Sequence, residues 1–68
     1  MDAHLLLLMQ AANSGVRCEF CVDSYGVALD GIAAGLLQWD AHSVTTVRVA
    51  GQSQGFALTE KGKATPSS

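Results

Sequence analysis

The stretch "GFALTEKGKA", residues 55–64, joins an expected strand to an expected short helix and decides how the chain is interpreted. Phe56 and Leu58 are separated by one small residue, the spacing of side chains on one face of a strand. Thr59 follows in the position of a residue that caps a helix, and Glu60 begins the capped segment. The sequence therefore predicts a strand that ends at Leu58 and a short helical turn after it.

The residues before this stretch predict a second strand and hence a β-hairpin. The segment "SVTTVRVAG", residues 43–51, is rich in β-branched residues, which favour strands. Its alternation puts Thr45, Val47 and Val49 on one face and Val44, Thr46 and Arg48 on the other. The "GQSQG" segment, residues 51–55, is interpreted as the turn. We expect a hairpin over residues 44–58, with Phe56 and Leu58 buried against Leu36 and Trp39.

Two helices are expected before the hairpin. Residues 2–13 favour helix by composition, and "NSG" at residues 13–15 is a typical helix end. Leu5, Leu8, Met9 and Ala12 share one stripe, while Leu6 and Leu7 point elsewhere. The run from Leu5 through Leu6 and Leu7 to Leu8 therefore predicts a homodimer contact in addition to a core.

A longer helix is expected over residues 27–39. Its apolar positions follow each other at intervals of three, four and three residues, the spacing of one helix face. These positions are Leu29, Ile32, Leu36 and Trp39. The opposite side is formed mainly by small residues, Ala28, Gly31, Ala34, Gly35 and Gln38. Interior glycines cost roughly 1 kcal/mol each relative to alanine, so we expect another surface to approach this side closely.

The segment between the two helices fits two interpretations. Val16, Cys18 and Phe20 alternate with charged residues, which suits a short strand. A strand of two or three residues followed by a short helix over residues 19–24 fits equally well. Periodicity cannot choose between them over so few residues.

Length and composition limit the classes of protein to which the chain can belong. Its 68 residues allow one domain, expected over residues 1–64, with a flexible tail over residues 65–68. A hydrophobic content of 49% argues against intrinsic disorder, and a formal charge of -2 is unlike that of most nucleic-acid-binding proteins. The apolar run near the N-terminus is too short to span a membrane and lacks a basic flank. We expect a cytoplasmic protein with no membrane partner.

The residue types used in catalysis and metal binding form incomplete patterns. Cys18 and Cys21 have the spacing of half a zinc or redox site, and His4 and His42 do not complete it. We favour the interpretation that both cysteines are small buried hydrophobic side chains in a reducing compartment, with zinc and redox roles as alternatives. No serine has the context of a catalytic triad. The sequence predicts no enzyme activity and no cofactor.

The order of these elements, closed by "GFALTEKGKA", resembles the winged helix-turn-helix family of MarR-like and small phage-encoded regulators. The resemblance implies a small α+β domain with a C-terminal β-hairpin wing. It implies helices over residues 2–13, 19–24 and 27–40, a short strand over 16–18, a turn at Tyr25 and Gly26, and the wing over 44–58. Within "FALTEKGKA", the aromatic residue, Leu58, Thr59 and Gly62 stand as in the second wing strand of that family.

The resemblance also implies where DNA or another partner would bind. In the family the third helix enters the major groove and the wing contacts the backbone. The residues so placed are Ala28, Asp30, Gly31, Ala34, Gly35 and Gln38 on the helix, Arg48, Gln52, Ser53 and Gln54 on the wing, and Lys61 and Lys63 near its edge. Only Gln38 on this helix is a usual reader of bases, and a small-residue face suits protein contact better. Two hypotheses result: a weakly binding or dimeric DNA-binding transcription regulator, or a protein-binding module or inhibitor.

Overall fold

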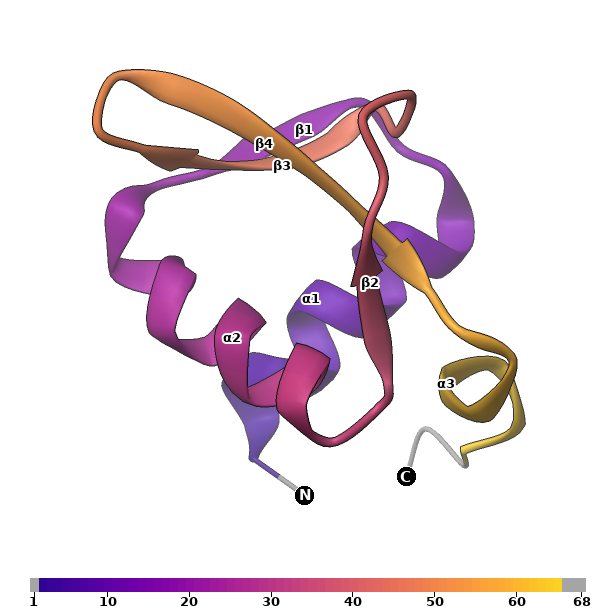
Figure 1. Ribbon diagram of the computed structural model, residues 1–68. Helices are drawn as coiled ribbons and strands as arrows, with labels where there is room; N and C mark the ends of the chain where they lie inside the picture. Colours follow the sequence, from indigo (N-terminus) through magenta and orange to yellow (C-terminus); the bar gives the residue numbers. More distant parts are fainter. Residues whose placement is uncertain (1, 66–68) are drawn as a thin grey trace.

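The computed structural model describes residues 2–65, which form a small α+β domain with three α-helices and a four-stranded mixed sheet (Figure 1). The elements in chain order are α1 (Ala3–Ser14), β1 (Cys18–Phe20), the 3-10 turn η1 (Val22–Ser24), α2 (Tyr25–Ala33), β2 (Leu37–Trp39), β3 (Thr45–Val49), β4 (Gln52–Leu58) and α3 (Glu60–Ala64).

The strand order in the sheet is β1-β3-β4-β2. β1 runs parallel to β3, and the other two pairs are antiparallel, with Arg48 opposite Ser53 and Trp39 opposite Phe56. Helices α1 and α2 pack on the same side of the sheet (Figure 1). The core therefore lies between this helix pair and one face of the sheet.

Apolar side chains of both helices and of three strands fill this core. Its buried members are Leu5, Leu8, Met9, Ala28, Leu36, Leu37, Val47, Phe56 and Leu58. The predicted inward stripe of the first helix is confirmed, since three of its members are buried and Ala12 packs against the cluster. The predicted burial of Phe56 and Leu58 is also confirmed, and Thr45 and Val47, which were expected to share one strand face, are both buried.

The predicted hairpin is present, but its turn lies earlier than expected. Ala50 and Gly51 both have positive φ angles, 50° and 80°, and they connect β3 to β4 directly. A two-residue turn with this backbone matches the twist of the flanking strands. Gln52 and Gln54 therefore belong to β4 and not to a turn.

The expected helix over residues 27–40 is wrong at both ends. Tyr25 and Gly26, expected as a turn, begin α2, and the helix ends at Ala33. Gly35 has a φ of 75°, and the Leu36 N–H donates to the Gly31 carbonyl at 2.9 Å while the Gly35 N–H donates to Ile32. This pair of bonds is the glycine-based helix ending known as the Schellman motif.

The three residues after this ending pair with β4. Leu37 lies opposite Leu58 and is buried, so the strand gains both backbone bonds and core packing. These contacts outweigh the three- and four-residue spacing that favoured a continuous helix, because local periodicity says nothing of strand partners. Leu36 and Trp39 consequently lie outside α2.

The segment between the helices is a strand followed by a single 3-10 turn. Glu19 lies in β1 opposite Thr46, so the expected helix over residues 19–24 is wrong except at η1. Because the second and third helices of the expected arrangement are not formed as predicted, a winged helix is not confirmed.

The predicted helical turn after the hairpin is confirmed as α3. The Thr59 hydroxyl accepts a hydrogen bond from the Gly62 N–H at 3.0 Å and donates one to the Gly35 carbonyl. The cap thus joins α3 to the turn that ends α2. Of the predicted tail, the Thr65 hydroxyl donates a hydrogen bond to the Lys61 backbone carbonyl at 2.8 Å, and residues 66–68 lie outside the described part of the chain.

Candidate functional site

Two residues of the predicted binding face on α2 point into the core. Ala28 is fully buried and Gly31 is buried as well. A Cβ on Gly31 would lie 2.6 Å from Cδ1 of Leu37 and 3.0 Å from Cδ1 of Leu5. The prediction that these two residues face a partner is therefore wrong, because the small side of the helix is the one that approaches the protein's own leucines.

The other predicted contact residues do not share one surface element. Asp30 is exposed on α2, Ala34 and Gly35 belong to its C-terminal turn, Gln38 is exposed on β2, and Gln52, Ser53 and Gln54 are exposed on β4. Gly35 therefore does not continue a helical ridge from Gly31. The structure leaves most of these side chains accessible but disperses them over three elements.

Three of the four basic side chains have partners within the chain. Arg48 Nε lies 3.1 Å from Glu19 Oε1, Lys63 Nζ lies 3.7 Å from Glu60, and Lys61 Nζ donates to the Ala34 carbonyl at 3.1 Å. Arg48 pairs with Ser53 near the start of β4, whereas both lysines lie in α3, after the end of β4 at Leu58. The five-residue step from Ser53 to Leu58, at about 3.3 Å per residue, separates Arg48 from the start of α3 by roughly 17 Å along β4. The cations predicted to contact DNA thus do not form one basic patch.

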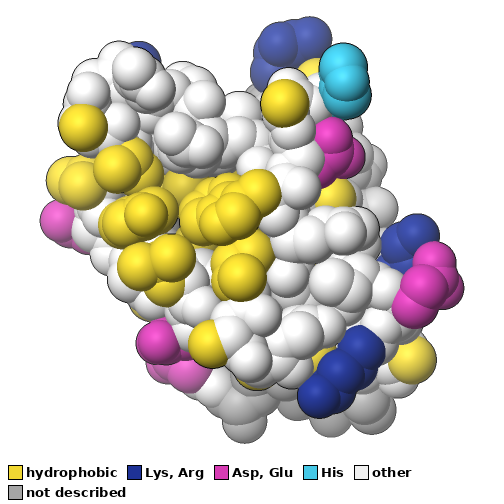
Figure 2. Space-filling model, viewed as in Figure 1, with side chains coloured by type: hydrophobic (Ala, Val, Ile, Leu, Met, Phe, Trp, Pro, Cys, Tyr) yellow, Lys and Arg dark blue, Asp and Glu magenta, His cyan; other side chains and the backbone are white. Residues whose placement is uncertain are grey.

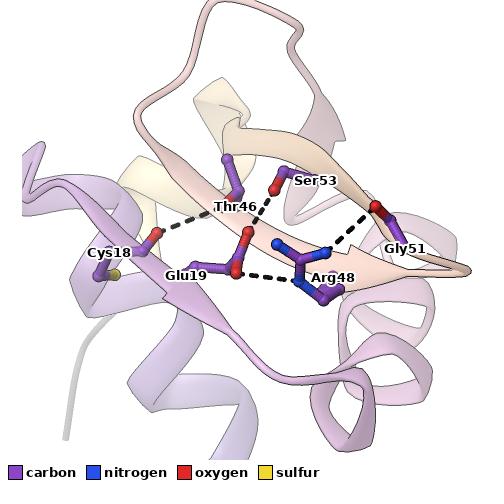
Figure 3. Close-up of polar contacts among 6 residues, drawn as sticks. All are labelled: Cys18, Glu19, Thr46, Arg48, Gly51 and Ser53. Atoms are coloured by element: carbon purple, nitrogen blue, oxygen red, sulfur yellow. Dashed lines mark hydrogen bonds and ion pairs between the residues drawn. The ribbon is translucent and has the colours of Figure 1, made fainter.

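The outer face of the sheet carries a polar cluster that joins three strands (Figure 3). The Glu19 carboxylate accepts hydrogen bonds from the Ser53 hydroxyl and from Arg48, whose guanidinium also donates to the Gly51 carbonyl at 3.1 Å. The bond from Ser53 and then that from Arg48 hold the pKa of Glu19 below its ordinary value. The arrangement holds the hairpin end against β1, which gives Arg48 and Ser53 a structural partner.

The leucine run of α1 offers less surface than a dimer contact through all four residues requires. Leu5 and Leu8 belong to the core, so their predicted place in a dimer surface is wrong. Leu6 is half-buried, and Leu7 has 54% of its surface exposed. The leucines that face the core are thus unavailable to another molecule, and the accessible apolar surface of this leucine run is mainly that of Leu7.

A different group of apolar side chains lies exposed beside α2. Val22, Leu29 and Trp39 have 58%, 41% and 41% of their surfaces exposed. Val22, Tyr25 and Leu29 are three and four residues apart, which places them on one flank of η1 and α2. We call these four residues the α2–β2 patch. Figure 2 shows hydrophobic side chains gathered on this face between α2 and the β3–β4 hairpin.

An aromatic pair joins the two elements of the patch. The rings of Tyr25 and Trp39 are stacked with centroids 6.1 Å apart and an interplanar angle of 26°. Tyr25 also packs against the core, while Trp39 stands on the edge strand β2. The expectation that Trp39 is a core residue is therefore wrong. Its core position was expected from the helical spacing of residues 29, 32, 36 and 39, but Trp39 belongs to a strand and not to a helix.

Three acidic residues are chain neighbours of the exposed residues of the patch. Asp23, Asp30 and Asp40 each directly follow one of its exposed members in the sequence, as "VD", "LD" and "WD". Among the described residues, none of the three forms an ion pair. Acidic side chains are visible around the apolar area in Figure 2. This repeated apolar–Asp pairing is a sequence signal for the site that differs from the basic residues expected to contact DNA.

The cysteines and histidines do not come together. Cys18 is half-buried and Cys21 is exposed, so the expected burial of Cys21 is wrong, and both thiols are free. His4 shares a hydrogen bond of 2.9 Å with Ser24, which links α1 to the residue before α2. Within residues 2–65 no three His, Cys, Asp or Glu side chains are grouped in a way that could hold a metal ion.

Comparisons with known proteins do not place the chain in a family. No family model matches it, and neither a curated protein nor a solved structure matches it. In the part of the chain that the structure describes, none of the helices has the length and apolar character needed to cross a membrane.

Proposed function

We propose that this chain is a small protein-binding module that contacts another protein through the α2–β2 patch. The observation that carries the proposal is the exposure of Val22, Leu29 and Trp39 on one face, together with the stacked ring of Tyr25. Tryptophan and tyrosine are enriched among the residues that dominate the energy of protein interfaces. Grouped apolar side chains of this size mark interaction surfaces more often than isolated ones do.

The patch residues still expose enough apolar surface to contribute to binding when a partner covers them. Complete burial of a large aliphatic side chain contributes about 1.5–3 kcal/mol, and Leu29 and Val22 retain about half of that potential. Each would therefore add roughly 1 kcal/mol in a complex. Association carries a cost in lost freedom, so the patch serves as the centre of an interface that extends onto neighbouring polar residues.

DNA binding by a winged-helix regulator remains the second hypothesis and has less support. Three of the four cations are engaged within the chain, and three aspartates are chain neighbours of exposed patch residues. DNA affinity depends on basic groups that neutralise phosphates, and carboxylates oppose it. These charges favour a protein partner.

A pull-down with matched variants tests the proposal. Immobilised wild-type protein, Leu29→Asp and Leu7→Asp are exposed to the same cell extract, and the retained proteins are quantified by mass spectrometry. Leu7 is the control because it is similarly exposed but lies on α1. We expect a protein that is retained by the wild type and by Leu7→Asp but not by Leu29→Asp.

Two results would contradict the proposal. One is equal retention of every captured protein by all three baits. The other is tight binding of mixed-sequence duplex DNA by the wild type that weakens steeply with added salt, because that behaviour is the mark of phosphate contact.

A further inference from the structure

The charges around the α2–β2 patch define the chemistry of its partner. We infer that the patch binds a protein segment in which lysine or arginine residues flank large apolar side chains. This inference rests on the proposed function and adds the charge and composition of the partner to it.

The first argument is the position of the uncompensated negative charge. Two of the six acidic residues, Glu19 and Glu60, are paired with Arg48 and Lys63. Three of the other four are Asp23, Asp30 and Asp40, each the chain neighbour of an exposed patch residue. The Asp40 carboxylate accepts a hydrogen bond from the His42 N–H at 2.9 Å, but none of the three forms an ion pair among the described residues. The negative charge that no internal cation neutralises therefore lies around the apolar surface (Figure 2).

The second argument is that the basic residues lie elsewhere. Arg17 precedes β1, Arg48 is bound on the outer face of the sheet, and both lysines belong to α3. None of them is a chain neighbour of Val22, Leu29 or Trp39. Lys61 does reach α2, but at its C-terminal end, where it donates to the Ala34 carbonyl. A partner with basic side chains would thus meet carboxylates around the patch, and α2 and β2 themselves contain no Lys or Arg.

The same charges disfavour a second copy of this chain as the occupant. In a symmetric dimer through the patch, the three aspartates of one copy would approach those of the other, because such an interface uses the same surface twice. Like charges brought together in this way oppose association. A basic partner removes this repulsion and turns it into attraction.

The expected contribution of the aspartates is modest and depends on salt. One exposed ion pair strengthens binding by roughly 1.5- to 5-fold, so two independent pairs together contribute roughly 2- to 25-fold. The effect should decline between about 0.01 M and 0.15 M salt, over which the screening length falls from about 30 Å to 8 Å.

The test uses a random library of twelve-residue peptides, since the natural partner is not identified. The library is selected at low salt on the wild type, on Leu29→Ala, on a double variant Asp23→Asn/Asp30→Asn, and on a control double variant Asp2→Asn/Glu60→Gln. Both double variants remove two negative charges, but Asp2 and Glu60 lie outside the patch elements. Far-UV circular dichroism confirms that each variant is folded.

We expect the wild type to enrich peptides that combine Lys or Arg with large apolar residues. The best of these peptides should bind Asp23→Asn/Asp30→Asn about fivefold more weakly and the control double variant unchanged. Enriched peptides that are apolar but neutral or acidic, and that are lost on Leu29→Ala, would overturn the inference and leave the proposed function intact. Enrichment that Leu29→Ala does not change would overturn both.

Discussion

Replacement of Gly62 by alanine should destabilise the domain, although alanine is the better helix former. A Cβ at Gly62 would lie 2.2 Å from the Leu36 carbonyl oxygen and 3.0 Å from Cδ2 of Leu58. Ordinary carbon–oxygen contacts are not closer than about 3.3 Å, so α3 would have to move by about 1 Å. The obstacle is a backbone oxygen, which cannot rotate away.

The expected size of the effect follows from what this movement disturbs. Overpacking costs about 1–3 kcal/mol, and the bond from the Thr59 N–H to the Leu36 carbonyl, 3.1 Å long, contributes a further 0.5–1.5 kcal/mol. Higher helix propensity returns up to about 1 kcal/mol. The net loss is about 2 kcal/mol, a large part of the roughly 3–10 kcal/mol typical of a chain of this length.

The assay is urea unfolding followed by far-UV circular dichroism, with Gly26→Ala as the control. Gly26 is also helical, but a Cβ there has nothing within 4 Å, so this variant should gain up to about 1 kcal/mol. Equal stability of the two alanine variants would refute the close packing of α3 on Leu36.

Three further changes probe the sheet and the core. Removing the Glu19 charge with Glu19→Gln should lower the free energy of unfolding at neutral pH. Because the pKa of Glu19 is depressed in the folded state, the carboxylate stabilises the fold above the ordinary glutamate pKa of about 4.3, and this stabilisation is lost as Glu19 is protonated at lower pH. Urea unfolding at pH 7 and pH 3 should therefore show a smaller difference between the variant and the wild type at pH 3. Thr45→Val should cost about 1–3 kcal/mol in the same assay at neutral pH, since the buried Thr45 hydroxyl donates to the Val16 carbonyl at 3.0 Å, whereas Thr46→Val on the outer face should cost under about 0.5 kcal/mol. Phe56→Ala should cost about 3–5 kcal/mol and leave the chain largely unfolded by circular dichroism; a cooperative unfolding transition like that of the wild type would contradict its place in the core.

The parts of the fold that the sequence predicted are those set by local patterns. The stripe of α1, the two hairpin strands and the Thr59 cap each depend on residues close together in the chain. Side-chain periodicity and capping chemistry act over a few residues, so they can be recognised without knowledge of the partners.

The errors lie where distant residues decide the structure. Gly35 ends α2 because Leu37 finds a place opposite Leu58, twenty-one residues later, and nothing in the helical spacing indicates that pairing. The face of α2 was assigned incorrectly for the same reason. Gly31 is buried because two leucines, Leu5 and Leu37, approach the helix there. Ala28 belongs to the same core, and Leu29 is left exposed.

The sequence suggested the type of site, a protein-binding surface, but not the residues that form it. A protein-binding role for the region around α2 was one of two hypotheses drawn from its small residues, but the surface proposed now is formed by larger ones, Val22, Tyr25, Leu29 and Trp39. The sequence could have indicated the repeated aspartates beside them. It could not show that these positions share a surface, since Trp39 reaches Tyr25 only through the pairing of β2 with β4.

The most direct test of the account is a calorimetric titration with the tightest-binding library peptide against the wild type, Leu29→Asp and Leu7→Asp. A buried leucine at an interface centre contributes about 1–2 kcal/mol, and an introduced carboxylate adds a desolvation cost. We expect Kd to rise at least tenfold for Leu29→Asp and to change less than twofold for Leu7→Asp. Equal dissociation constants for the three folded proteins would contradict binding through the α2–β2 patch.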